Sequence, residues 1–544
     1  MNKPASTHSY FSLLIVLVFC SPALAQHPAS VIRIDSGELQ GVVEDGVEIF
    51  RGIPYAQPPV AELRWRPPQP VVPWEGVRDA SQFGHVCPQR SGLYPTWVDE
   101  HFASMGRNED CLTINIWTPV ERGDQPLPVM FYFHGGNMQY GAGSVPVFDG
   151  RLLASQGVVL VTINYRIGYL GRFAHPVMTR AQSAEPLVNY GLFDQIAALE
   201  WVQRNIAEFG GNPDDVTIFG HSAGGVSVNF LMTTPQSKGL FHKAIAQGSA
   251  VGVDLSQHAF KRGMPGPIEQ SREEVGIDFA EHFAITAATD EELLKKLRAL
   301  PWEPIVEYQT KKQIAFGPVV DGRVVVDHVA QVFERGEQHD VPYIGGANNW
   351  EWSQIAGIPL IGKWFLGGEL IRGLSDEDLA PFDDQWTRIG LSQRYFAEGM
   401  FLTSTRYLGK QMANVSSPSW LYHATYVQTN LRGEVPGAGH GIEIPFIFGH
   451  VREHPEWQRP RKMTGRAVTD EDLAWGDTVQ AYWLNFAKTG NPNGPGLPEW
   501  PQYDPTSDLV MELGEEIVPR QGLHKETLDY LEERALIRRQ NFLQ

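Results

Sequence analysis

Cysteine is scarce in this chain, whose 544 residues contain three: Cys20, Cys87 and Cys111. So few thiols exclude a small scaffold held together by many disulfides. The sequence also lacks the C-x-x-C and H-E-x-x-H spacings that are typical of zinc sites. No metal or cofactor is therefore predicted.

Basic residues and long apolar runs are also in short supply. Lys and Arg number 44 against 63 Asp and Glu, which gives a net charge of −19. Such a surface repels phosphate backbones and anionic lipid, so no nucleic-acid partner is predicted. The longest apolar run, Phe11–Cys20 (FSLLIVLVFC), is too short to cross a bilayer as a helix, and no membrane span is predicted.

The residues around the N-terminal apolar run have the pattern of an export signal. Lys3 precedes it, and Ala23-Leu24-Ala25 follows with small residues at the positions that signal peptidase requires. Bulky Phe19 argues against lipid attachment at Cys20. Residues 1–25 are therefore predicted to be a signal peptide, and residues 26–544 a secreted or periplasmic protein. Export leaves Cys87 and Cys111 in an oxidising compartment, where an even pair predicts one disulfide.

Apolar patterning beyond the signal peptide indicates a folded α/β protein, and 15 Trp, 27 Phe and 17 Tyr exclude a disordered one. Residues 31–50 alternate as short antiparallel strands do. Further along, continuous apolar runs predict buried strands, and apolar residues three or four apart predict helices. The predicted order is strand Val129–His134, strand Val158–Tyr165, helix Asp194–Phe209, strand Val216–Phe219 and a helix to Met232. This alternation predicts a parallel sheet covered by helices.

The rest of the mature chain shows no Pro/Gly linker between two domains, and one domain over residues 26–544 is predicted. Residues 255–315 and 360–410 have a helical pattern and are interpreted as insertions into the sheet domain. Strands are expected to return at Val341–Ile344, Trp420–Tyr426 and 444–448.

A nucleophile turn is predicted at Gly220-His221-Ser222-Ala223-Gly224, which fits the G-x-S-x-G pattern. In that turn a strand passes sharply into a helix, the serine takes a strained conformation, and glycines two places away leave it room. The expected strand and helix flank this motif, so an exposed serine Oγ is predicted. Upstream, His134-Gly135-Gly136-Asn137 follows a strand where such hydrolases place donors for the oxyanion.

Together with these motifs, an ordered set of stretches resembles the type-B carboxylesterase/cholinesterase family over nearly the whole mature chain. They are FRGIPYAQPP (50–59), EDCLTINIWTP (109–119), NYGLFDQIAALEWVQRNIAEFGGNP (189–213), FGHSAGG (219–225), FGPVVDG (316–322), GANNWEW (346–352), GAGHGIEIPFIFG (437–449) and WLNFAKTGNPN (483–493). The resemblance implies an α/β-hydrolase fold with a large, mostly parallel sheet, helices on both faces and helical insertions.

The resemblance also implies residue roles. Ser222 is expected as nucleophile, Glu351 as acid and His440 as general base, with the N–H groups of Gly136, Asn137 and Ala223 as oxyanion donors. His440 stands out among 17 histidines because Gly437 and Gly439 place it in a tight loop between two expected strands. His134 is expected to brace the oxyanion loop. Cys87 and Cys111 correspond to the family's first disulfide. The candidate substrate-pocket residues are His221, Met138, Trp97, Trp350 and Trp352.

Several positions depart from the family pattern. Asn137 replaces a third glycine, and Gly248 replaces a serine that commonly supports the acid–histidine pair, a contact that is either missing or supplied by Ser249. His221 and His101 stand where cholinesterases carry a glutamate and a choline-stacking tryptophan, so a choline-ester specialist is not expected. Trp350 and Trp352, which flank Glu351, are either core residues or walls of the acyl side.

The function expected from these residues is hydrolysis of small-molecule carboxylic esters through an acyl-enzyme. Two alternatives stay open. The same triad can hydrolyse amides, carbamates or lactones, and related chains serve as non-catalytic binding modules, although those typically lose the serine or the histidine that this chain keeps.

Overall fold

The computed structural model describes residues 27–92, 96–181, 188–253, 270–312, 317–353, 393–452 and 468–543. The predicted signal peptide, residues 1–25, lies outside them. Among the described residues, no helix is both long and apolar enough to cross a membrane.

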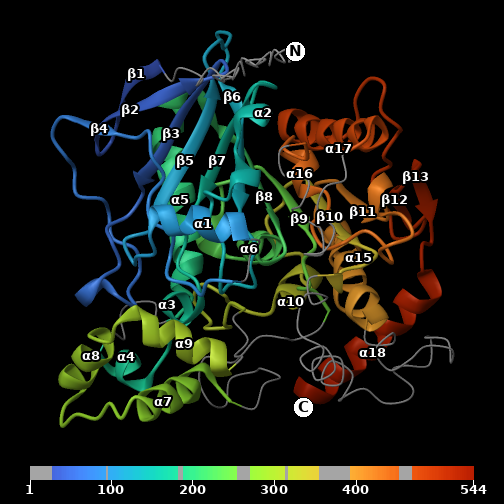
Figure 1. Ribbon diagram of the computed structural model, residues 1–544. Helices are drawn as coiled ribbons and strands as arrows, with labels where there is room; N and C mark the ends of the chain where they lie inside the picture. Colours follow the sequence, from blue (N-terminus) through green and yellow to red (C-terminus); the bar gives the residue numbers. More distant parts are fainter. Residues whose placement is uncertain are drawn as a thin grey trace, which may run out of the picture.

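A thirteen-stranded sheet runs through the molecule (Figure 1). Its first part is antiparallel and contains β1 (His27–Ile34), β2 (Gly37–Glu44), β3 (Val47–Pro54) and β5 (Thr113–Pro119), with β4 (Val77–Asp79) beside β2. Seven parallel strands follow in the spatial order β7 (Val159–Ile163), β6 (Leu127–Phe133), β8 (Gly211–His221), β9 (Lys243–Gln247), β10 (Tyr343–Asn348), β11 (Ser419–Ala424) and β12 (Leu509–Leu513). Antiparallel β13 (Ile517–Gln521) closes the edge. The strands expected around 31–50, 129–134, 158–165, 216–219, 341–344 and 420–426 are confirmed.

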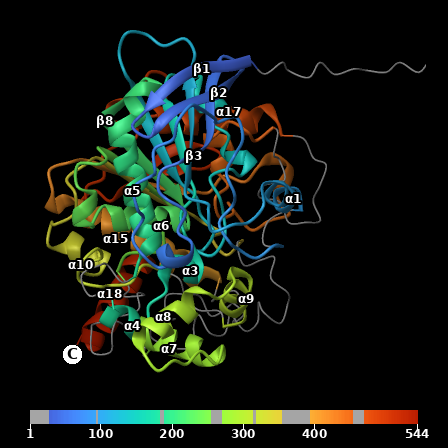
Figure 2. The same ribbon diagram turned by 90° about the vertical axis from the view of Figure 1, so that its left-hand side faces the viewer.

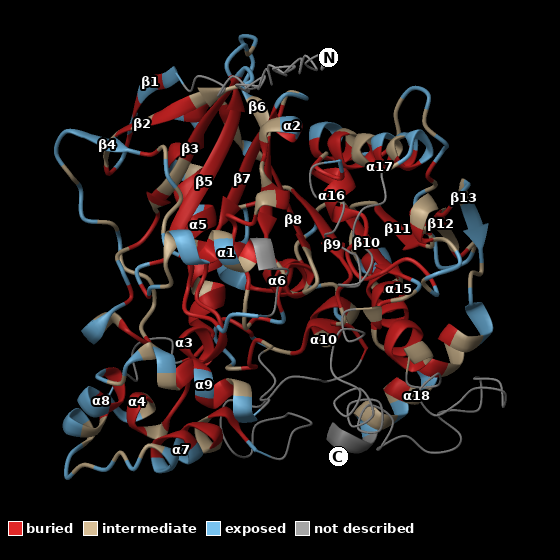
Figure 3. Ribbon diagram, viewed as in Figure 1, coloured by how far each residue is buried: buried red, intermediate tan, exposed pale blue. Residues whose placement is uncertain are grey.

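The central strands are buried along their whole length because helices cover both faces of the sheet. Every residue of β7, β9, β10 and β11 is buried, and Figure 3 shows these strands buried and the outermost ones partly exposed. Successive residues of β6 point to opposite cores. Val129 and Phe131 pack in the core that contains α5 (Tyr190–Asn205), whereas Met130 and Tyr132 pack in the core that contains α17 (Asp470–Thr489). In the side view of Figure 2, α5 and α17 lie on opposite sides of the sheet.

Helical insertions leave the sheet at the ends of the parallel strands. Three of them, α7 (Arg272–His282), α8 (Asp290–Arg298) and α9 (Trp302–Lys312), gather with α3 (Gly168–Arg172) and α4 (Pro176–Ala181) at one end of the molecule (Figure 1). The second expected insertion is helical over its described part, the π-helix η5 (Tyr395–Leu402) and α15 (Thr403–Gln411).

The remaining helices complete the layers. They are α1 (Thr96–Met105), α2 (Arg151–Ala154), α6 (Ala223–Leu231), α10 (Val329–Glu334), α16 (Ile444–Ile447) and α18 (Lys525–Leu543). Short 3-10 helices are η1 (Ala61–Leu63), η2 (Pro146–Phe148), η3 (Ile206–Phe209), η4 (Pro235–Ser237), η6 (Met412–Asn414) and η7 (Thr429–Leu431).

The structure corrects two of the sequence-based predictions. The helix expected at 194–209 begins four residues earlier, at Tyr190, and its last turn is the 3-10 helix η3, which ends at left-handed Gly210 (φ 79°). The strand expected at 444–448 is wrong, because this segment forms α16. Pro445 occupies the first turn of that helix, where its missing N–H is tolerated, whereas a central strand would need the N–H.

Candidate active site

Ser222 lies in the sharp turn between β8 and α6. Its backbone is left-handed in φ (φ 59°, ψ −122°), and its N–H donates to the Gln247 carbonyl at 2.8 Å. The flanking glycines are required by close packing: a Cβ on Gly220 would lie 2.5 Å from the Gly224 backbone, and one on Gly224 would lie 1.9 Å from the Phe133 oxygen. The turn therefore has the strained geometry that the motif predicted, and it presents the serine beyond the end of the parallel strands.

Glu351 and His440 come together beside this turn. The carboxylate of Glu351 is fully buried and accepts a hydrogen bond from His440 Nδ1 through Oε2 and another from the Asn348 N–H at 2.7 Å through Oε1. The Ser353 hydroxyl accepts from the His440 N–H at 2.6 Å. Since Nδ1 faces a carboxylate, Nε2 is the basic nitrogen of the ring. It is buried and has no hydrogen-bond partner within the described chain.

His221 packs on the ring of His440, with 4.3 Å between the ring centroids and 52° between the planes. Burial, with the His440 charge as a smaller contribution, holds the pKa of His221 well below its usual range, so this imidazole is neutral. His221 therefore supplies neither the negative charge nor the cation-binding wall of a choline site.

The His221 ring also explains Gly248. A Cβ at position 248 would lie 3.3 Å from atoms of both His221 and His440, at a φ of +53°. A serine would add a hydroxyl to this crowded space, so the two departures from the family pattern, His221 and Gly248, belong together. Ser249 makes no hydrogen bond to Glu351 or His440 among the described residues, and its hydroxyl instead accepts from Asn229 Nδ2 at 3.0 Å and from the Val251 N–H at 3.4 Å.

The loop after β6 packs directly on the nucleophile turn. A Cβ on Gly135 would lie 2.7 Å from the His221 oxygen and 3.1 Å from Ser222 Cβ, and Gly136 has a φ of +115° that suits only glycine. Asn137 accepts a left-handed φ of 51°, a conformation that asparagine tolerates. In the part of the chain that the structure describes, the N–H groups of Gly136, Asn137 and Ala223 donate to no protein acceptor.

Buried side chains hold this loop from behind. His134 stacks on Tyr165 at 4.4 Å, its Nδ1 contacts the Gly135 oxygen at 2.7 Å, and burial lowers its pKa to about 4. His134 thus braces the loop as expected. Asp194 has a structural role, because its carboxylate forms a two-point ion pair with Arg166 at 2.7 and 2.8 Å.

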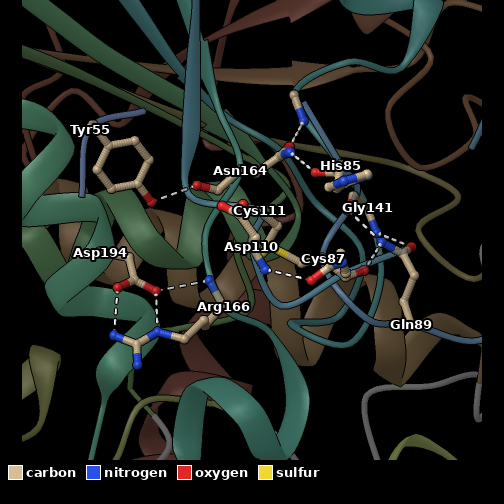
Figure 4. The surroundings of a disulfide bond; sticks show 12 residues. Tyr55, His85, Cys87, Gln89, Asp110, Cys111, Gly141, Asn164, Arg166 and Asp194 are labelled. Atoms are coloured by element: carbon tan, nitrogen blue, oxygen red, sulfur yellow. Dashed lines mark hydrogen bonds and ion pairs between the residues drawn. A yellow bond between two sulfur atoms is a disulfide. The ribbon is translucent and has the colours of Figure 1, made fainter. Parts of the chain in front are cut away.

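A disulfide joins Cys87 to Cys111. Gln89, two residues beyond Cys87, binds the loop that follows β6 (Figure 4). The Gln89 amide accepts from the Gly141 N–H at 2.8 Å and donates to the Gly141 oxygen at 2.9 Å. Asn164 makes a second bridge, accepting from the Gly143 N–H at 2.8 Å and donating to the His85 oxygen at 3.0 Å. Side-chain amides thus connect the disulfide segment to the oxyanion loop.

The other predicted pocket residues have mixed surroundings. Trp352 is buried in a cluster with Phe396 and Phe401, against which Trp350 packs, and Phe401 contacts His440 at 5.7 Å between ring centroids. The two tryptophans are therefore part of the core that supports the base. Met138 is buried against Arg172. The side chain of Trp97 lies outside the described residues.

The sequence-based reasoning missed Glu443, a second fully buried carboxylate near the site. It accepts hydrogen bonds from Gln247 Nε2 at 3.2 Å, Asn348 Nδ2 at 3.1 Å and the Tyr422 hydroxyl at 3.2 Å. Burial raises its pKa, and the Glu351 charge adds to this effect. The available signal was a single acid inside the apolar stretch GIEIPFIFG.

This geometry matches that of known enzymes. The chain belongs to the carboxylesterase family, whose sequence model matches residues 28–360 and 379–531. It is 32% identical to the fumonisin B1 esterase of Sphingopyxis macrogoltabida over 96% of this chain and 93% of that protein. It is also 32% identical to the para-nitrobenzyl esterase of Bacillus subtilis, covering 90% and 95% of the two chains.

Solved structures agree with the sequence comparisons. A para-nitrobenzyl esterase structure superposes with a TM-score of 0.78 at 29% identity, covering 92% of this chain and 99% of the other. The carboxylesterase of Geobacillus stearothermophilus gives the same TM-score at 28% identity, with 92% and 100% covered. The protein is thus an α/β-hydrolase and a carboxylic ester hydrolase.

Proposed function

We propose that the protein cleaves carboxylic esters with Ser222 as nucleophile, His440 as general base and Glu351 as the acid that orients it. The observation that carries this proposal is the buried Glu351–His440 pair beside the strained Ser222 turn. The carboxylate fixes Nδ1 as the protonated nitrogen and stabilises the imidazolium, which leaves Nε2 to accept the serine proton.

In this proposal the reaction has two balanced halves. Ser222 Oγ attacks the ester carbonyl carbon while its proton passes to His440 Nε2, and the carbonyl oxygen becomes an oxyanion. The intermediate then collapses, the C–O bond to the alcohol breaks, and His440 returns the proton to the alcohol. Water then attacks the acyl-enzyme carbonyl while its proton passes to His440 Nε2. The bond between the acyl carbon and Ser222 Oγ breaks, the acid leaves, and His440 returns the proton to Ser222 Oγ.

The N–H groups of Gly136, Asn137 and Ala223 are proposed to bind the oxyanion. Two findings support this role: these donors have no protein acceptor among the described residues, and Gly135 brings the loop against Ser222. Donors fixed before the reaction stabilise the developing charge without reorganisation.

We also propose export of the protein. Residues 1–25 would be removed, and residues 26–544 would act as one catalytic domain. The Cys87–Cys111 disulfide supports an oxidising destination, and the sheet that begins at β1 and ends at β13 supports a single folded unit.

Labelling with a fluorophosphonate, combined with a p-nitrophenyl ester series, tests the nucleophile. Ser222→Ala should remove both the label and the hydrolysis, lowering kcat by several orders of magnitude. Ser155→Ala, which changes an exposed serine after α2, is the control and should retain both. A label that maps to another serine in the native protein would contradict the assignment.

A further inference from the structure

Arg172, the last residue of α3, is a buried cation without a carboxylate partner. Only 2% of the surface of Arg172 is exposed. Nη2 donates to the Met138 sulfur at 3.0 Å, while Nε and Nη1 are buried and have no hydrogen-bond partner in the described ranges. A thioether is a weak acceptor, so nearly all of the hydrogen-bonding capacity of this guanidinium is unused.

Three other buried arginines have carboxylate partners. Arg64, Arg166 and Arg406 each bind one carboxylate through both Nε and Nη2, those of Glu109, Asp194 and Asp508 respectively. Removing a cation from water is unfavourable by several kcal/mol unless an anion compensates it, which is the usual reason for such pairs. Arg172 departs from this pattern.

The charges around Arg172 do not compensate it. Asp194 acts on it from a distance, but both oxygens of that carboxylate are already bound by Arg166. Tyr165 is neutral because burial raises its pKa. Arg272 adds a second positive charge nearby. Burial lowers the pKa of Arg172 to about 10, so the side chain remains a cation at neutral pH.

The position of this cation relates it to the reaction. Met138 directly follows the proposed oxyanion donors Gly136 and Asn137, and its own oxygen accepts from the Gly168 N–H of α3 at 2.6 Å. In the proposed mechanism the carbonyl oxygen points at this loop, whereas the alcohol leaves on the side of His440, which protonates it. The acyl part is the remaining substituent of the carbonyl carbon, and it is assigned here to the side of Arg172.

We propose that Arg172 binds a carboxylate on the acyl part of the substrate, so that the enzyme hydrolyses esters of dicarboxylic or polycarboxylic acids that keep a free carboxylate. This inference rests on the proposed function of Ser222 and His440. The carboxylate replaces the Met138 sulfur as acceptor and forms the two-point pair that Arg64, Arg166 and Arg406 already have. The unbranched methionine side chain is flexible enough to move aside.

Matched ester pairs test the proposal in the full-length protein. Monobenzyl succinate is compared with benzyl 4-oxopentanoate, in which a methyl group replaces the carboxylate oxygen, and monobenzyl glutarate with benzyl 5-oxohexanoate. Release of benzyl alcohol gives kcat/KM for each. We expect the native enzyme to prefer the anionic ester of at least one pair by tenfold or more. The preference should persist at high salt, because a buried pair is little screened.

Arg172→Met should reduce that preference at least tenfold, and the ratio within each pair cancels any general effect that loss of the Met138 contact has on the loop. An unchanged circular dichroism spectrum and continued hydrolysis of the neutral esters show that the variant folds. Arg180→Met, which removes an exposed guanidinium from the neighbouring helix α4, should preserve the preference. Equal rates on both members of each pair in the native enzyme would overturn the proposal, whatever the variants do. An equal loss on anionic and neutral esters in Arg172→Met would also overturn it.

Failure of the proposed function is distinguishable from these outcomes. If Ser222→Ala still hydrolysed the neutral esters, the triad assignment itself would be wrong. A native enzyme that hydrolyses neutral esters through Ser222 but shows no anionic preference refutes only the role of Arg172.

Discussion

At the scale of single residues, His221 and Gly248 act as a coupled pair. The ring of His221 fills the space that a side chain at position 248 would need, so each of these residues fits because of the other. Substitutions that restore the family residue at only one of the two positions should therefore be harmful.

Gly248→Ser should lower kcat/KM about tenfold or more, because it adds a side chain at positive φ against the general base. Gly248→Ser combined with His221→Ala should recover part of the loss, since the smaller side chain gives the serine room. Steady-state kinetics of the two single variants and the double variant form a cycle that measures the coupling. Additive effects would show that the two positions are independent.

Choline esters should have no advantage over their neutral isosteres. His221 is neutral because burial keeps its pKa well below the usual range, and it therefore offers no charge to a trimethylammonium group. The measurement compares kcat/KM for butyrylcholine and 3,3-dimethylbutyl butyrate at high salt, where steering by the −19 net charge is screened. A tenfold preference for the cation would reveal a cation site elsewhere in the pocket.

The G-x-S-x-G motif was enough to predict the strained turn at Ser222, and the family resemblance pointed to Glu351 and His440, which the structure brings together beside that turn. The crowding at Gly248 and the contacts of Glu443 with the site were not predictable. Each depends on side chains that meet only in the folded protein, from segments about 27 and 95 residues away respectively.

At the scale of elements, hydrogen bonds join the segment around Cys87 to the loop that follows β6. Gln89 holds both backbone groups of Gly141, much as a neighbouring strand would. The geometry of the loop therefore depends on a side chain from a segment that supplies none of the proposed catalytic groups.

Gln89→Leu should lower kcat about tenfold and change KM little, because the ground-state ester needs the oxyanion donors less than the transition state does. Gln89→Glu, which can still accept from the Gly141 N–H, should lie between the native enzyme and Gln89→Leu. Gln57→Leu removes an exposed amide contact and is the control. A change confined to KM would indicate that Gln89 shapes substrate binding instead.

Replacing Cys87 and Cys111 with serine should lower the free energy of unfolding by about 3–4 kcal/mol, as expected for opening a loop of this length. Because Gln89 lies two residues from Cys87, kcat should also fall in the same direction as in Gln89→Leu. Denaturant titration and steady-state kinetics on one preparation measure both effects. Unchanged kcat in the folded double variant would separate the disulfide from the clamp.

Continuous β-rich runs such as Val129–Phe133 were predictable as strands because such a sequence is typical of a strand buried on both faces. The run at 444–448 is equally apolar but forms α16. Short apolar runs do not separate a buried strand from a buried helix, and here Pro445 and the packing of α16 on α17 decide between them.

At the scale of the whole molecule, buried histidines make stability sensitive to mild acid. Burial lowers the pKa to about 4 for His134, His175 and His328, and to about 3 for His423. Below pH 6.5 these histidines bind protons in the unfolded chain but stay neutral in the folded protein. Stability is therefore full above pH 6.5 and is lost as the pH falls toward 4.

Urea unfolding at pH 7 and at pH 5 should show this loss as a lower midpoint at pH 5. His423→Phe should reduce the difference between the two midpoints, because it removes one buried imidazole whose two nitrogens have no hydrogen-bond partner in the part of the chain described here. An unchanged difference in this variant would assign the acid sensitivity to other groups.

The clamp between Gln89 and Gly141 also ties activity to where the protein is made. Its anchor, the bond between Cys87 and Cys111, forms only where thiols oxidise. If the protein is exported as proposed, a newly synthesised copy in a reducing cytosol carries every proposed reacting group yet lacks the tether between Cys87 and Cys111. Hydrolysis of the cell's own esters would then be slow until the chain had crossed the membrane, and translocation itself would be the final step of maturation.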